Sequence, residues 1–159
     1  MNRKGTSIVV SLAILSAGAL TILPGTGNAA SRTQTLRFFD KPVSMKVTHS
    51  DGTVVAHPPF PEPRTGDTLD VNSLDYSGNH SRHSKRFIAS AHVRCTFGAG
   101  PPTCVSQVAI DDSLLIFTGT PGTVSNGTGK YQGATGRVIS SKKLKNNASD
   151  IVARIYLRS

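Results

Sequence analysis

Apolar side chains recur at every second position along most of this chain, and this alternation limits the fold more than any other feature. The clearest case runs from Lys85 to Phe97. Its apolar residues would share one face of an extended strand: Phe87, Ala89, Ala91, Val93 and Cys95. The opposite face would carry Arg86, Ile88, Ser90, His92 and Arg94. A period of two is typical of a half-buried β-strand, and no segment beyond the apolar start of the chain shows convincing helical periodicity.

The remaining expected strands are 33–49 (interrupted by Pro42), 67–76, 104–110, 113–118, 135–142 and 150–157. Pro42 predicts a bulge or an edge position, because proline cannot donate a hydrogen bond to a ladder. Asp111 and Asp112 form a tight turn between two of these strands. Seven or eight short strands at steady spacing predict an all-β sandwich or a closed barrel. Closure would remove the exposed strand edges.

Residues 1–30 have the pattern of an export signal. Arg3 and Lys4 precede an apolar stretch from Ile8 to Leu23, and small residues follow a Pro-Gly break. Cleavage near Ala29 or Ala30 fits this pattern. The apolar stretch is about 16 residues, short of the roughly 20 that a spanning helix needs, so a stable membrane anchor is not expected. We therefore expect a secreted, extracellular protein with one domain at residues 31–159.

Export also bears on the two cysteines, Cys95 and Cys104, which frame the segment CTFGAGPPTC. The glycines and prolines between them are turn residues, so two strands meeting there would bring the thiols together. In an oxidising compartment this arrangement predicts one disulfide that joins a hairpin.

The chain is basic, with a net charge of +9. Positive residues cluster at Arg82, Lys85 and Arg86, and again at Lys142, Lys143 and Lys145. The chain has no Trp and only 6% aromatic residues, so it is poorly supplied with stacking platforms for nucleic acid. We expect no nucleic-acid partner. We interpret the positive charge as a surface property that either binds an anionic surface or keeps the protein soluble.

Two segments between strands carry unusual composition. Four prolines lie between His57 and Arg64, which predicts an extended loop of polyproline character. The second segment, GTGKYQGATG, runs from Gly127 to Gly136. A phosphate-binding glycine loop requires a helix after it, whereas RVISSKK follows here and is β-like. We therefore expect these glycines to shape the backbone, with positive φ at Gly127 and Gly129, and Tyr131 to fill the space between strands.

This glycine segment resembles the G-T-G-x-[Tyr/Phe]-x-G-A-x-G signature of the allene oxide cyclase and dirigent barrels, especially their exported actinobacterial members. The matching residues are Gly127, Gly129, Tyr131, Gly133, Ala134 and Gly136. A Gly66-Asp67 pair before a strand and the positions of the two cysteines agree as well, so the resemblance covers about residues 33–159.

The resemblance implies an eight-stranded antiparallel up-and-down β-barrel with an internal cavity. It implies a cofactor-free protein that acts as a cyclase (an isomerase), or directs stereochemistry, on an apolar small molecule held in the barrel. It also implies that the chain associates as a homodimer or homotrimer. Neither a metal nor an organic cofactor is expected.

Four polar residues on the expected strands are candidates for catalysis: Asp70, Tyr76, His92 and Arg94. Asp or His would act as a general base, and Arg or Tyr would stabilise developing charge. The alternative is that these side chains form the solvated face of half-exposed strands. His80 and His83 lie three residues apart in an expected polar turn without a third ligand, so we do not expect them to bind a metal.

Three functions stay open at this point. The first is the cofactor-free cyclase or stereochemistry-directing protein. The second is a non-catalytic secreted protein that binds a hydrophobic ligand or an anionic surface, and the third is an inhibitor that presents the loop 57–64. A cyclase requires a hollow barrel with a polar group that faces an otherwise apolar interior.

Overall fold

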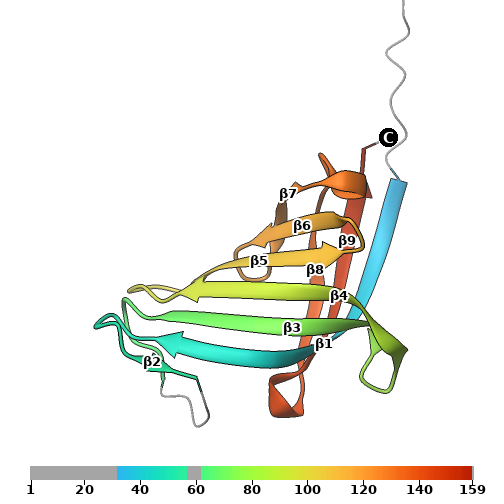
Figure 1. Ribbon diagram of the computed structural model, residues 1–159. Helices are drawn as coiled ribbons and strands as arrows, with labels where there is room; N and C mark the ends of the chain where they lie inside the picture. The colour runs from blue at the N-terminus through green and yellow to red at the C-terminus, as the bar shows by residue number, and fades with distance from the viewer. Residues whose placement is uncertain (1–31, 57–61, 159) are drawn as a thin grey trace, which may run out of the picture.

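The computed structural model describes residues 32–56 and 62–158, which are coloured in Figure 1. The expected export signal and the prolines of residues 57–61 lie outside this range. The nine strands are β1 (Arg32–Thr48), β2 (Val54–Val55), β3 (Thr68–Asn79), β4 (Arg82–Thr96), β5 (Thr103–Ile110), β6 (Ser113–Thr118), β7 (Thr123–Gly127), β8 (Thr135–Lys143) and β9 (Ser149–Leu157). Two short 3-10 helices, η1 (Gly129–Tyr131) and η2 (Lys145–Asn147), lie in turns. Among the described residues, no helix is long and apolar enough to span a membrane.

The strands form one antiparallel sheet that closes into a barrel (Figure 1). Neighbours in the chain are neighbours in the sheet from β3 to β9, and β1 pairs with both β3 and β9. The closed barrel therefore has eight strands, and β2 is an additional short strand on β1. The expected eight-stranded barrel is confirmed, and the sandwich alternative is excluded.

Strand β1 reaches two neighbours because it is long and bends. Its first part, Arg32–Asp40, pairs with β9, and its second part, Phe38–Thr48, pairs with β3. The register of the β1–β3 ladder shifts between Pro42 and Ser44. The expected bulge at Pro42 is confirmed, and it reverses which residues of β1 face inward.

The seven strands expected from the alternation all form, whereas β2 and β7 were not predicted. Strand β7 lies in the glycine-rich stretch and has only five residues, so it shows little periodicity. Residues 77–84, expected as a polar turn, instead continue β3 and β4 almost to the tip. The turn is short because the Asn79 carboxamide oxygen accepts hydrogen bonds from the backbone N–H groups of Ser81 and Arg82.

The predicted disulfide is present. Cys95 on β4 and Cys104 on β5 lie opposite each other in the β4–β5 ladder and are joined by a disulfide bond. The residues between them form the turn that the glycines and prolines predicted.

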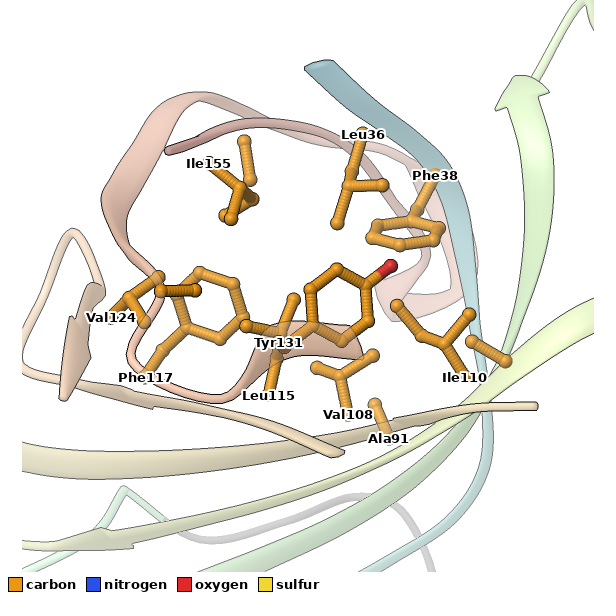
Figure 2. Packing of buried hydrophobic residues seen from close by; sticks show 13 residues of the cluster. Leu36, Phe38, Ala91, Val108, Ile110, Leu115, Phe117, Val124, Tyr131 and Ile155 are labelled. Atoms are coloured by element: carbon orange, nitrogen blue, oxygen red, sulfur yellow. The ribbon is translucent and has the colours of Figure 1, made fainter. Parts of the chain in front are cut away.

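One end of the barrel is filled by side chains, and Tyr131 lies among them with its hydroxyl directed toward Phe38 (Figure 2). Tyr131 is only 1% exposed, as expected for a residue that fills the space between strands. The cluster consists of Leu36, Phe38, Ala89, Ala91, Val108, Ile110, Leu115, Phe117, Val124, Tyr131, Ala134, Ala153 and Ile155.

Glycines allow the chain to approach this core closely. A Cβ at Gly127 would lie 2.3 Å from the carbonyl oxygen of Tyr131, and one at Gly136 would lie 2.1 Å from that of Arg154. Positive φ occurs at Gly129 as expected, but not at Gly127. Glycine is required at position 127 because a Cβ there would have no space. The motif therefore shapes the backbone around Tyr131.

Candidate functional site

The other part of the barrel is hollow. A cavity of about 560 Å³ lies between β4–β5–β6 on one side and β8–β9–β1 on the other. Its wall is mostly apolar, with Phe38, Val108 and Phe117 shared between the cavity and the packed core. The packed end thus closes the cavity on one side.

The cavity lies beside the weakest seam of the barrel. Strands β7 and β8 share one residue pair, Thr123 with Arg137. Beyond Arg137, residues 138–141 of β8 line the cavity, together with the β6–β7 turn at residues 119–122. Ile139 is 43% exposed at this position. The barrel wall beside the cavity therefore has little ladder pairing between β7 and β8.

Two carboxyl groups, Asp40 on β1 and Asp75 on β3, face this apolar cavity. They are directly opposite each other in the β1–β3 ladder. Asp75 is only 2% exposed, and Asp40 is half-buried. Such a pair is costly to bury when both groups are charged, because two like charges in a poorly solvated site repel each other.

Burial, together with repulsion between the two carboxylates, raises the pKa values of this pair. Burial, followed by the charge of Asp40 and a hydrogen bond with it, raises the pKa of Asp75 to about 8. Burial also raises the pKa of Asp40, against the smaller opposing effect of hydrogen bonds with Ser73 and Asp75. At neutral pH the pair therefore retains a proton that it can donate within the cavity.

The sequence had predicted other catalytic residues, and three of them form a cluster on the outside of the barrel. Asp70 accepts hydrogen bonds from Nε and Nη2 of Arg94, at 2.9 and 3.3 Å. The Nε2 atom of His92 lies 3.2 Å from the same carboxylate, and the Lys46 ammonium lies 3.7 Å from it. Burial alone would raise the pKa of Asp70, but Arg94, then His92 and Lys46, hold that pKa below its usual value.

Strand alternation explains why this cluster lies outside. Asp75 lines the cavity, and Asp70 lies an odd number of positions from it on β3, so the two face opposite sides of the sheet. His92 and Arg94 flank Val93, which lines the cavity. These three side chains therefore lie on the outer face of the sheet, the alternative that the sequence left open, and their catalytic role stays a prediction.

Tyr76 is also outside, in a group of three rings in which Tyr76 and Phe39 are half-buried and His83 is exposed. Its ring centroid lies 6.1 Å from that of Phe39 and 5.3 Å from that of His83. His83 lies 4.8 Å from Phe39. Within the described residues, none of the four predicted catalytic side chains lines the cavity.

The sequence contains a signal that marks Asp75. Asp75 shares its strand face with Leu69 and Val71, and a carboxyl on an apolar face is unusual. The sequence indicates an inward position less clearly for Asp40. The bulge at Pro42 separates it from the alternation of Val43, Met45 and Val47, so its inward direction follows only from the ladder register.

His80 and His83 point to different partners. The Nδ1 atom of His80 lies 2.5 Å from Oδ2 of Asp150, whereas Nδ1 of His83 lies 2.8 Å from the carbonyl oxygen of Ser84. The described residues contain no group of three or more His, Cys, Asp or Glu arranged to hold a metal ion.

A second, smaller pocket of about 220 Å³ lies near the β1–β2 turn. Its buried carboxylate, Asp67, accepts hydrogen bonds from the backbone N–H groups of Ser50 and Arg64 and lies 2.9 Å from Nδ1 of His49. With these partners Asp67 ties two loops together, so we assign it a structural role.

The fold and the site define a class: a closed eight-stranded antiparallel barrel with a mostly apolar cavity that contains an acid pair. Two solved structures have similar folds. A pterocarpan synthase dirigent protein matches with a TM-score of 0.60 and 16% identity, over 91% of this chain and 98% of that chain. Pyocyanin demethylase matches with a TM-score of 0.57 and 13% identity, over 77% and 99% respectively. No protein-family model and no curated protein sequence matches the chain.

Proposed function

We propose that this protein binds an apolar small molecule in the barrel and transforms it by acid–base chemistry, without a cofactor. Cyclisation, another isomerisation or stereochemical control of a coupling step would each fit such a site. The observation that carries the proposal is the Asp40–Asp75 pair in a mostly apolar cavity.

The pair supplies the chemistry that such reactions need. Protonated Asp75 would donate a hydrogen bond or a proton to a substrate oxygen, and the carboxylate of Asp40 would stabilise the positive charge that develops. In an isomerisation the proton then returns to the pair, so no external reagent is consumed. The apolar wall would hold a flexible substrate in one folded shape, which lowers the entropic part of the barrier.

The size of the cavity is consistent with this function. At about 560 Å³ it falls within the roughly 300–1,000 Å³ typical of small-molecule sites. The two structural neighbours are named for reactions of small molecules, a demethylation of pyocyanin and the synthesis of a pterocarpan. Those names support small-molecule chemistry in this fold but leave the substrate of this chain open.

We further propose that the protein acts outside the cell after removal of residues 1–30. The disulfide between Cys95 and Cys104 supports this location, because such bonds persist in oxidising compartments. The non-catalytic alternative, binding of a hydrophobic ligand, uses the same cavity and differs only in the role of the acid pair.

Product stereochemistry tests the proposal. The protein would be incubated with an unsaturated epoxide and, separately, with a quinone methide precursor, and the products would be separated by chiral chromatography. We expect an enantiomeric excess with the wild-type protein and with Asp112→Asn, an exposed turn acid. We expect it to be lost with Asp75→Asn.

Binding of the fluorescent probe anilinonaphthalene sulfonate separates the two alternatives. Probe binding without any enantiomeric excess would overturn catalysis and favour the ligand-binding function. Failure to bind any apolar probe would overturn both uses of the cavity.

A further inference from the structure

The two basic clusters of the sequence come together at one end of the barrel. The β3–β4 hairpin carries Arg82, Lys85 and Arg86 on β4, and the β8–β9 hairpin carries Lys142 and Lys143 on β8 and Lys145 in η2. His80 joins these turns, since its backbone N–H donates to Oδ1 of Asp150 at 2.7 Å and its ring contacts Oδ2. In Figure 1 both turns lie at the end opposite the C-terminus. We call this surface the basic end.

Most of the charge of the basic end is free to act on a partner, although Lys142 lies opposite Asp150 and helps to lower the pKa of that carboxyl. All six cationic side chains are exposed, and none forms an ion pair within residues 32–56 and 62–158. The acidic side chain on this surface, Asp150, is already engaged by His80 at both carboxylate oxygens. The cations therefore repel one another unless an anionic partner covers them.

Apolar and aromatic side chains lie between the two groups of cations. The strand registers align Phe87, Tyr76, Phe39, Asp150 and Lys142 in one row across β4, β3, β1, β9 and β8. Phe87 is 56% exposed and the adjacent Ile88 is 40% exposed. The row thus runs from exposed apolar side chains to a lysine.

We propose that the basic end is a docking surface for an anionic phospholipid bilayer, bound reversibly and without insertion of a spanning segment. Lysine and arginine would meet the lipid phosphates, and Phe87 and Ile88 would enter the headgroup region. A soluble polyanion would use the cations alone and would gain nothing from the exposed apolar side chains. This proposal is independent of the chemistry in the cavity.

Sedimentation with vesicles tests the proposal. The protein would be mixed with vesicles of phosphatidylcholine alone, or of phosphatidylcholine with phosphatidylglycerol. We expect binding only to the anionic vesicles and weaker binding at high salt. Since each basic residue near an anionic bilayer contributes about fivefold to binding, Lys142→Ala/Lys143→Ala should lower the partition coefficient about 25-fold.

The matched control removes the same charge from the opposite end. Arg32 and Arg158 are exposed residues at the far ends of β1 and β9, so Arg32→Ala/Arg158→Ala should bind the vesicles like the wild-type protein. A loss equal to that of the lysine variant would show that net charge alone decides binding and would overturn the proposal. Absence of wild-type binding to the anionic vesicles would also overturn it.

Phe87→Ser distinguishes a bilayer from a soluble polyanion. We expect this variant to bind anionic vesicles more weakly and to bind soluble polyphosphate unchanged. Unchanged vesicle binding by Phe87→Ser, with strong wild-type binding to polyphosphate, would assign the basic end to a polyanion instead. Thermal melting would confirm that each variant is folded.

Discussion

Asp40 and Asp75 face each other across the β1–β3 ladder, with both carboxyl groups in the apolar cavity. Burial favours the neutral form of each group, and the charge of either one opposes ionisation of the other. The pair that retains a proton at neutral pH therefore lowers the free energy of unfolding when the pH is high and both groups must ionise.

The free energy of unfolding should depend on pH through Asp75. Its pKa is about 8 in the folded state, against about 3.9 in an unfolded chain. The folded state thus retains a proton that the unfolded state loses, and stability from this group falls as the pH rises from about 4 to about 8. Asp75→Asn should be more stable than the wild-type protein at pH 8, and the difference should shrink toward pH 4.

Urea unfolding at a series of pH values measures this difference. Asp112→Asn, in an exposed turn, serves as the control and should show a pH dependence like that of the wild-type protein. A difference between Asp75→Asn and the wild-type protein that is constant with pH would contradict a raised pKa at Asp75.

The outer cluster around Asp70 should affect stability but not the cavity. In Asp70→Asn, the charge that Arg94, His92 and Lys46 surround is lost, and the protein should become less stable near neutral pH. Because the folded pKa of Asp70 is lowered, this loss should fade as the pH falls below about 4. Binding of anilinonaphthalene sulfonate should stay unchanged, and a weakened affinity for that probe would place Asp70 in functional contact with the cavity.

Gly136 should tolerate no side chain. Its φ is +143°, and a Cβ would lie 2.1 Å from the carbonyl oxygen of Arg154 on the neighbouring strand. Gly136→Ala should therefore lower the free energy of unfolding by more than about 1 kcal/mol. Gly98 has open space around it, so Gly98→Ala should change stability by no more than about 0.5 kcal/mol in a thermal melt. Equal effects of the two substitutions would contradict the close approach at Gly136.

Tyr131 should contribute through its ring and not through its hydroxyl. The hydroxyl is buried and has no hydrogen-bond partner among the described residues. Tyr131→Phe should thus raise the free energy of unfolding by about 1 kcal/mol, whereas Tyr131→Ala should lower it by about 3–5 kcal/mol. Denaturant unfolding measures both, and a marked loss in Tyr131→Phe would contradict an unpaired hydroxyl.

The disulfide should stabilise the β4–β5 hairpin by restricting the unfolded chain. Replacing Cys95 and Cys104 together by alanine should lower the free energy of unfolding by about 2–3 kcal/mol, a modest amount because the closed loop is short. Mass spectrometry with and without reductant checks the bond in the wild-type protein. Two free thiols in the purified wild-type protein would contradict the bond.

Much of the fold was predictable because it follows from local patterns. Alternation identified seven strands, Pro42 identified the bulge, and the segment between the cysteines identified a linked hairpin. Strand β7 was missed because five residues among glycines carry too little periodicity to recognise.

The candidate site was not predicted, and the reason is geometric. The sequence alone determined that His92 and Arg94 share one face of their strand, and the register of the β3–β4 ladder places Asp70 beside them. Which face points inward depends on how the sheet closes and on the register shift at Pro42, which only the tertiary structure decides. Closure places Asp40 beside Asp75 and leaves Asp70 outside, because alternate side chains of a barrel wall face opposite environments.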